Sequence, residues 1–394
     1  MKGVLLGLAL SLSLGSVPCV ALASAPFIDL HVHPFMDDGM GTLFHGKFES
    51  ELRATDWTAK LSSQINIESL EASQLGIVVV SLYAHPVFAN GRKPSIRRQL
   101  VRVAEFVKTH PNWIIARGPV EAQRALHNGK RVLILALEGA SGVLESEADL
   151  REFIDEHGIR IVTLLHLTDD HLGGSAFFKS FKGLLLSPIS WFLQMFSPTT
   201  DSDGVKLNRN GLSQDGVELT HKLLQRKVWI DLAHASDEAQ KALIPILREA
   251  HQPLLYTHVV LRKYYPAERG MAEWQISEVE KTGGIIGLMP SEEMLEHTPS
   301  QCDDGIHKLA EQFKTIGKRI GASSMSIGSD FNGGINHLKP PVCPTGTKFD
   351  AQGLWNIGQS GDMWYALKSL GIPWPASDDG FITTFLQNWA KFQL

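Results

Sequence analysis

The sequence has few cysteines, no long run of one charge, no low-complexity tract and no internal repeat. Three of its 394 residues are cysteine, and 42 acidic residues stand against 37 basic ones. A mildly acidic chain without basic clusters does not suit a polyanionic partner, so nucleic acid is excluded from the expected partners. Because no Pro/Gly-rich linker divides the chain either, we expect a single domain over residues 26–394.

The first apolar run is too short to be kept as a transmembrane span. Lys2 precedes an apolar stretch at residues 4–14, and small residues follow at 21–25. This order is typical of an export signal, so residues 1–25 are interpreted as a signal peptide that is cut after Ala23. The mature protein would then be periplasmic or secreted. Cys19 as a lipid anchor is the weaker alternative, because Pro18 precedes it.

Two cysteines remain after cleavage, Cys302 and Cys343. In an exported protein they could form a disulfide, and two separate buried thiols are the alternative. Loss of Lys2 leaves 36 basic and 42 acidic residues, a net charge of −6.

Short apolar runs alternate with amphipathic segments along the chain. Eight of them occur, at residues 27–33, 77–83, 132–138, 161–166, 228–234, 253–258, 284–289 and 325–330. Each is too short for a helix and is continuously apolar, as expected of parallel strands covered by helices. Residues 95–108 and 213–225 have a helical pattern, and Ser213 can cap the second. The alternation predicts an α/β fold, the (β/α)8 TIM barrel, whose active site lies where the strands end.

Residues 176–196 do not fit this alternation. The segment is rich in aromatic residues and carries two charges, and Gly183 and Pro188 interrupt it, so a membrane-spanning helix is not expected. We interpret it as an insertion packed on the barrel or on a second subunit of a homodimer. A lid and a membrane-surface contact are the alternatives.

Residue types that bind metals occur in five of the eight runs. They are His31 and His33, Glu138, His234, His258 and Asp330. Taken singly, a buried histidine is more often a core residue, and a buried glutamate more often pairs with arginine. Strand ends of a barrel converge, however, and imidazole and carboxylate groups suit zinc or a similar divalent ion. The pattern predicts a metal-dependent hydrolase in which Asp330 also transfers protons.

Several motifs resemble one family in its order along the chain. Residues 211–216 (GLSQDG) and 229–236 (WIDLAHAS) are similar to a characteristic stretch of the membrane dipeptidase (renal dipeptidase) family of the amidohydrolase superfamily. Further matches are residues 137–139 (LEG), 162–166 (VTLLH), 257–258 (TH), 283–287 (GGIIG) and 327–333 (IGSDFNG). The resemblance covers nearly all of the mature chain.

The resemblance implies a site with two zinc ions. Glu138 would bridge them, with His31 and the residue at position 33 on one ion and His234 and His258 on the other. It implies dipeptide hydrolysis by a hydroxide that bridges the metals.

It also implies three further roles. His166 would polarise the scissile carbonyl, Asp330 would handle protons, and Arg269 would bind the free carboxylate of the dipeptide. Arg262 is the rival for the last role, because the planar fork of either arginine suits a carboxylate.

One position departs from the family. The family usually has HxD on the first strand, whereas this chain has His31-Val32-His33. A neutral ligand in place of a negative one makes the paired site more positive and removes a carboxylate that could hold the substrate's amino group. Hydrolysis of another amide, an ester or a lactone is therefore the alternative activity, and an exported metal- or peptide-binding barrel is the non-enzymatic one.

Overall fold

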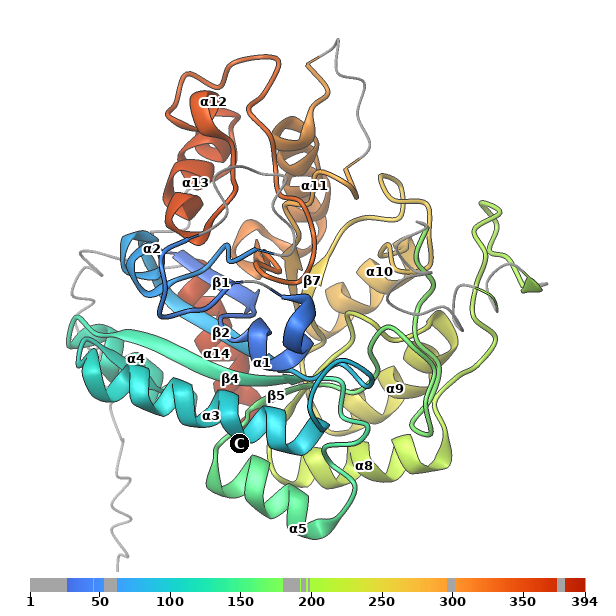
Figure 1. Cartoon of the computed structure of the whole chain (residues 1–394). Coiled ribbons are helices and arrows are strands. Elements are labelled where there is room, and N and C mark those ends of the chain that lie inside the picture. Colours follow the sequence, from blue (N-terminus) through green and yellow to red (C-terminus); the bar gives the residue numbers. More distant parts are fainter. Residues whose placement is uncertain are drawn as a thin grey trace, which may run out of the picture.

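The computed structural model of the chain (Figure 1) describes residues 27–44, 46–52, 62–179, 192, 196, 197, 199–295, 302–373 and 380–393. The predicted signal peptide lies outside the described residues. So does most of the predicted insertion at residues 176–196.

The described residues contain nine parallel strands in one sheet. They are β1 (Phe27–Val32), β2 (Leu75–Tyr83), β3 (Trp113–Ile115), β4 (Arg131–Glu138), β5 (Ile161–Thr163), β6 (Trp229–Asp231), β7 (Leu255–Val259), β8 (Ile285–Leu288) and β9 (Met325–Ile327). Eight of them close into a barrel, because β2 pairs with β4 and β9 pairs with β1. The predicted (β/α)8 barrel is therefore confirmed, and each predicted run overlaps one barrel strand.

The ninth strand, β3, was not predicted. It pairs with the first residues of β4, on the edge that β5 uses further along. The register then brings Tyr83, Glu138, Thr163 and Asp231 to one level, since each pairs with the next across the barrel. All four stand at the carboxyl ends of their strands.

Helices surround the barrel (Figure 1). They are α1 (Met36–Met40), α2 (Ile67–Ala72), α3 (Arg92–Thr109), α4 (Pro119–His127), α5 (Glu147–Asp149) continued by a π-helix (Leu150–Glu156), α8 (Gln214–Gln225), α9 (Asp237–Glu249), α10 (Glu273–Thr282), α11 (Gly305–Ile320), α12 (Phe349–Gln352), α13 (Ser360–Ser369) and α14 (Phe381–Gln393). Short 3-10 turns occupy Gly41–Leu43, Ala322–Ser324 and Ile357–Gln359. Both predicted helices are present as α3 and α8, and the Ser213 hydroxyl caps α8 by accepting from Gly216 N.

The last helix, α14, closes the barrel end opposite to the strand carboxyl ends. Its Phe385 stacks on Trp229, the first residue of β6, with ring centroids 5.6 Å apart. Asn388 and Gln393 donate to the carbonyls of Gly283 and Lys227, which precede β8 and β6. Because this end is sealed by aromatic packing, access to the strand ends is from the other side.

The structure also bears on the two remaining cysteines and on the apolar insertion. Cys302 and Cys343 form a disulfide, with Cα atoms 5.1 Å apart. Within the described ranges, no helix combines the length and the apolar character that crossing a membrane requires. Of the insertion, residues 176–179, Phe192 and Phe196 are described; Ala176 and Phe177 are buried, and the rings of Phe192 and Phe196 are exposed.

Candidate active site

The predicted metal-binding residues lie together at the carboxyl ends of the strands. His31 is in β1, Glu138 ends β4 and His258 is in β7. The strands β5, β6 and β9 were each expected to end at a site residue. Each of them ends three residues earlier, so these three predicted runs were too long. The three site residues, which stand on the following loops, are His166, His234 and Asp330.

Glu138 is the centre of the cluster. Its Oε1 lies 3.2 Å from Nε2 of His31, 3.2 Å from Nε2 of His234 and 3.5 Å from Nε2 of His258. Its Oε2 lies 3.3 Å from Nε2 of His33 and 3.4 Å from Nε2 of His166. One buried carboxylate therefore faces five imidazoles from four different strands or strand loops.

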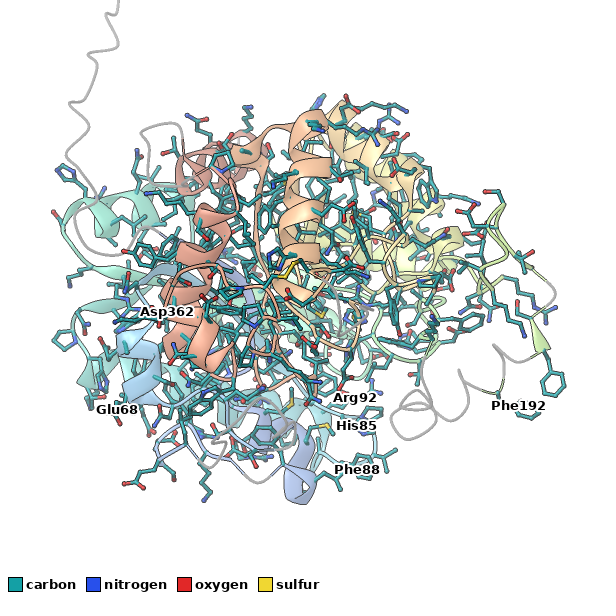
Figure 2. The ribbon with its side chains drawn as sticks, turned by 90° about the horizontal axis from the view of Figure 1, so that it is seen from above. Glu68, His85, Phe88, Arg92, Phe192 and Asp362 are labelled. Atoms are coloured by element: carbon teal, nitrogen blue, oxygen red, sulfur yellow. A yellow bond between two sulfur atoms is a disulfide. The ribbon has the colours of Figure 1, made fainter. Side chains whose placement is uncertain are left out.

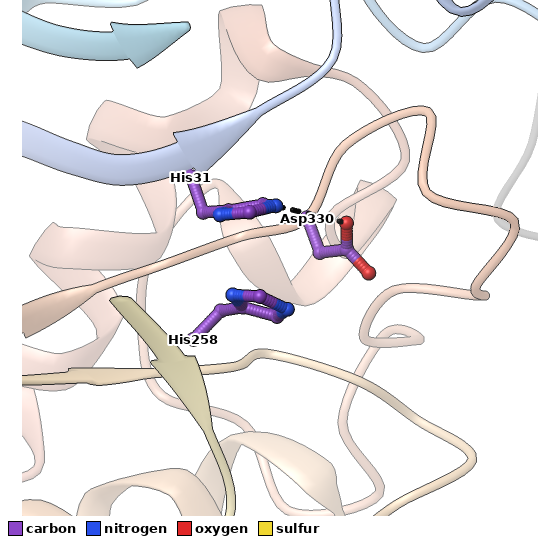
Figure 3. A group of neighbouring side chains, drawn as sticks. All are labelled: His31, His258 and Asp330. Carbon is purple, nitrogen blue, oxygen red and sulfur yellow. Dashed lines mark ion pairs between the residues drawn. The ribbon is translucent and has the colours of Figure 1, made fainter. Parts of the chain in front are cut away.

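The histidines also face one another. Nε2 of His31 is 3.1 Å from Nε2 of His33, and Nε2 of His234 is 2.8 Å from Nε2 of His258. Figure 3 shows the rings of His31 and His258 lying beside each other, with centroids 3.7 Å apart, and Asp330 next to them. Asp330 Oδ1 lies 3.3 Å from His33 Nε2 and 3.9 Å from His31 Nε2.

Hydrogen bonds on the outer side of the rings fix their protons. His33 Nδ1 donates to the carbonyl of Ser81 at 2.9 Å, so in the neutral ring, the form that binds a metal, the lone pair is on Nε2. Thr257 Oγ1 donates to Asp231 Oδ2 at 2.7 Å and so accepts from Nδ1 of His258 at 2.9 Å and of His31 at 3.2 Å. The Nε2 lone pairs of these rings therefore point inward, as metal-binding imidazoles do.

The electrostatics of the cluster call for positive charge. Burial lowers the pKa of His33, but the carboxylates of Asp330 and Glu138 outweigh it and raise this pKa to about 10. Burial raises the pKa of Glu138, but the charges of His166 and His31 hold it well below its usual range. Burial also keeps the pKa of His234 and of His258 well below its usual value. Those two rings are neutral and can act as ligands.

Three groups of these side chains have donor atoms close enough to share one ion. The groups are His31, His33 and Glu138; Glu138, His234 and His258; and His31, His258 and Asp330. Convergent lone pairs and a buried carboxylate without enough donors would repel one another unless a cation lay between them. The donor set, imidazole nitrogen with carboxylate oxygen, thus fits divalent zinc.

Asp330 stands on a tightly held turn. Both Asp330 and Asn332 have positive φ values, 57° and 67°. A Cβ at Gly333 would collide with the Asp330 carboxylate, so this position needs glycine. Asn332 donates from Nδ2 to His33 O at 2.9 Å, which ties the turn to the first strand.

A buried network supports that turn from behind. The amide of Gln64 accepts from Asn332 N through Oε1 at 2.9 Å and donates through Nε2 to Nδ1 of His337 at 3.1 Å. His337 Nε2 then donates to Ser329 O at 2.7 Å, one residue before Asp330. Nothing in the sequence indicated this network, because Gln64 lies more than 260 residues from its partners Asn332 and His337.

His166 lies at the edge of the cluster. Its ring packs edge-on against Tyr83 at 4.7 Å and His234 at 4.4 Å. Burial, the largest effect, lowers its pKa to about 4, although the charge of Glu138 opposes the shift. A neutral imidazole in this place can donate a hydrogen bond to an oxygen bound beside Glu138.

The two arginine candidates differ in their surroundings. Arg269 Nη2 donates to His258 O at 2.8 Å and lies 3.3 Å from His234 Nε2. Its Nε and Nη1 are buried, with no hydrogen-bond partner among the described residues. Arg262 instead makes two hydrogen bonds to Asp237, at 2.7 and 3.0 Å. The structure therefore brings Arg269, and not Arg262, to the cluster.

Two further buried carboxylates, Asp29 and Asp231, hydrogen-bond to groups beside the cluster. Asp29 Oδ1 accepts from His31 N and from Ser329 N, at 3.1 and 2.9 Å, and so joins the first and last strands. The hydrogen-bonding roles of Ser81 and Thr257 were missed. Thr257 precedes His258 directly, which was the one signal available for it.

A parallel barrel with an imidazole and carboxylate cluster at its strand ends defines a metal-dependent hydrolase. A sequence model of the membrane dipeptidase family, peptidase family M19, matches residues 21–184 and 195–340, well over half of the chain. The chain therefore belongs to this family and is a hydrolase of the metallo-dipeptidase type. The resemblance seen in the sequence is confirmed.

Named relatives are distant. Dipeptidase verJ of Clonostachys rogersoniana is 20% identical over 325 residues, which cover 79% of this chain and 73% of the relative. Dipeptidase aclJ of Aspergillus oryzae is 22% identical over 292 residues, 70% of this chain and 60% of the relative.

Solved structures share the fold over almost the whole chain. A metallopeptidase of Rhodobacter sphaeroides, bound to a phosphinate mimic of the dipeptide L-Ala-D-Ala, superposes with a TM-score of 0.66 at 13% identity and covers 94% of this chain and 99% of its own. The probable dipeptidase PvdM of Pseudomonas aeruginosa gives a TM-score of 0.65 at 14% identity, covering 94% and 96%.

Proposed function

We propose that the protein is a zinc-dependent dipeptidase with two zinc ions in each chain. The observation that carries the proposal is the position of Glu138, whose two carboxylate oxygens face imidazoles on both sides. His31, His33 and Glu138, with Asp330 beside them, would hold one ion. Glu138, His234 and His258 would hold the other. When bound, zinc supplies a water of lowered pKa and a Lewis acid for the substrate carbonyl.

The chain's own residues would do the rest. Asp330 is within 3.3 Å of the His33 nitrogen, so its carboxylate stands next to the proposed ion and can take a proton and return it to the leaving amine. His166, neutral at physiological pH, would donate to the carbonyl oxygen as negative charge develops on it.

Arg269 supports a substrate with a free carboxyl terminus. Burial lowers the pKa of this guanidinium, with the charges of Asp330 and Asp231 opposing the shift. A buried cation with unsatisfied N–H groups is costly unless an anion reaches it. A carboxylate of the substrate that accepts from one of these free N–H groups would supply the missing negative charge, and this requirement would restrict the enzyme to short peptides.

The test is an assay of dipeptide hydrolysis with purified protein before and after chelation. We expect activity to vanish with the metal and to return with two zinc ions for each chain, as counted by elemental analysis. Asp330→Asn should abolish turnover and keep most of the metal, and Asp350→Asn, a carboxylate change at α12, should leave activity intact. Activity that ignores chelator and added zinc would reject the proposal.

His33 motivates one alternative activity. Because position 33 carries no negative charge here, the substrate's amino group loses a natural partner, and an amide, ester or lactone without that group becomes a rival substrate. Rates for dipeptides, N-acyl amino acids and lactones, measured side by side, separate the two activities. Full activity of Asp330→Asn would remove the proton-transfer role of Asp330, and no turnover of any of these substrates by the zinc-loaded protein would favour the non-enzymatic binding barrel.

We further propose that the mature protein is exported. Residues 1–25 have the order of a signal peptide, and the Cys302–Cys343 disulfide suits an oxidising compartment. Amino-terminal sequencing of the mature protein should give a chain that begins at Ser24. A chain that retains Lys2 would contradict export by this signal.

A further inference from the structure

A pocket adjoins the metal-binding cluster and opens to solvent. It is lined by residues of β2 and the loop after it, by the start of α3, and by the loops that follow β4 and β5. Glu138 and His166 belong both to this pocket and to the cluster. A group bound in the pocket therefore lies directly beside the bond that would be cleaved.

The pocket and Arg269 lie on different sides of the cluster. Arg269 contacts His234 and His258 and does not line the pocket, whereas the pocket wall contains Glu138 and His166. If the substrate's carboxylate is bound at Arg269, as proposed above, its carbonyl lies at the cluster and its amino-terminal residue extends into the pocket. The inference below rests on that proposed function.

The pocket contains donors suited to a carboxylate. The Tyr83 side chain is 6% exposed, and its hydroxyl has no hydrogen-bond partner among the described residues. Burial raises the pKa of this phenol, so the hydroxyl keeps its proton. An unpaired buried hydroxyl is costly, and an acceptor on a bound ligand would recover that cost.

Arg92 supplies a positive charge to the same pocket. It is the first residue of α3 and is half-buried, and its Nη1 donates to Ser141 O. A Cβ at Gly142 would lie 2.5 Å from Arg92 Cδ, so glycine at this position makes room for the guanidinium. Figure 2 shows Arg92 close to His85, and both line the pocket.

A negative charge is also present in the wall. Asp170 lines the pocket, and its Oδ1 accepts from Leu172 N at 2.8 Å. Arg92 and Asp170 form no ion pair in the described part of the chain, so each keeps capacity for a ligand. A pocket with one cation and one anion fits a residue that carries both charges.

We propose that this pocket selects dipeptides whose amino-terminal residue has an acidic side chain. Arg92 and the Tyr83 hydroxyl bind the side-chain carboxylate, and Asp170 pairs with the free ammonium group. Asp170 then supplies the negative charge that is missing at position 33, where His33 replaces the usual aspartate. Chain position alone could not reveal this, because Tyr83, Arg92 and Asp170 belong to three separate segments.

The experiment compares kcat/KM of the zinc-loaded enzyme for Glu-Ala, Gln-Ala and Ala-Ala. We expect Glu-Ala to exceed Gln-Ala by about tenfold or more, which corresponds to about 1.4 kcal/mol. Arg92→Gln should bring the ratio of kcat/KM for Glu-Ala to that for Gln-Ala close to one. Arg92→Glu should make the enzyme cleave Lys-Ala faster than Glu-Ala. Arg98→Gln is the matched control, since Arg98 is also on α3 but pairs with Asp38 outside the pocket.

The outcomes are separable. Equal rates for Glu-Ala and Gln-Ala, or an unchanged ratio in folded Arg92→Gln, overturn the acidic preference and leave the dipeptidase proposal standing. No cleavage of any dipeptide by zinc-loaded protein overturns both. Circular dichroism and zinc content show whether a variant is folded, and Arg92→Glu gives a gain of Lys-Ala cleavage that a damaged protein could not show.

Discussion

Acid should destabilise the protein through one buried histidine outside the metal cluster, His337. Its side chain is fully buried, with Nε2 donating to Ser329 O and Nδ1 accepting from the amide of Gln64. Gln64 cannot turn its oxygen toward the ring, because that oxygen already accepts from Asn332 N. A second ring proton would therefore face an N–H group, and the folded protein favours the neutral ring.

The size of the effect follows from the pKa. Burial, as the main cause, lowers the pKa of His337 from 6.5 to about 4 in the folded protein. The neutral ring's contribution is fully present above pH 6.5 and is lost as the pH falls toward 4. The shift of about 2.5 units amounts to about 3.4 kcal/mol in full, of which about 2 kcal/mol is lost by pH 5.

The assay is denaturant unfolding of wild type and His337→Gln at pH 7.5 and pH 5. The amide of glutamine repeats the acceptor, carbon and donor order of the neutral ring but takes no proton in this range. We expect the wild type to lose about 2 kcal/mol more than the variant between the two pH values. His127→Gln, at an exposed histidine of α4, should behave as wild type. Equal pH dependence of wild type and His337→Gln would refute the reasoning.

Three further predictions concern stability. The buried Glu268 carboxylate accepts hydrogen bonds from the backbone N–H groups of Phe177 and Asn208. Because these two residues flank the segment between them, Glu268→Ala should lower the free energy of unfolding by about 3 kcal/mol or more and speed proteolysis between residues 180 and 207. An unchanged rate of cleavage would contradict this prediction. Arg262→Ala should cost about 3 to 5 kcal/mol in thermal or denaturant unfolding, since it leaves Asp237 buried without its cation, and a loss under 1 kcal/mol would argue against a buried pair. Removal of zinc by chelation should lower the melting temperature, and the same melting temperature with and without metal would speak against a bound ion.

Much of the fold could be predicted because parallel strands under helices are short and continuously apolar. All eight barrel strands overlap a predicted run. The strand β3 was missed since Trp113–Ile115 is three residues long and pairs only with the beginning of β4. The ends of β5 and β6 were placed too late, because apolar residues continue into the loops that carry His166 and His234, and the end of β9 was placed too late because the run was extended to Asp330.

The cluster itself could be predicted because convergence of strand ends is a property of the fold. What surrounds it could not, since hydrogen-bond partners far apart in sequence leave no periodic signal. Gln64 and His337 are 273 residues apart and meet behind Asp330. The rivalry between Arg262 and Arg269 was likewise open in the sequence, and the pairing of Arg262 with Asp237 is visible only in three dimensions.

One hydroxyl group connects the two proposed zinc positions. Thr257 Oγ1 gives its proton to Asp231 Oδ2, so its lone pairs are left for Nδ1 of His258 and Nδ1 of His31, which belong to different proposed ions. Asp231 also accepts from Thr163 Oγ1 at 2.7 Å and from Thr257 N at 2.9 Å, which fixes its carboxylate between β5 and β7. The aspartate of the Ile230-Asp231-Leu232 motif therefore acts on histidines of neighbouring strands rather than on His234 three residues later. A change at Asp231 would release the Thr257 O–H bond and disturb the His258 side most, because Nδ1 of His31 also has Ser81 Oγ as a partner at 3.0 Å.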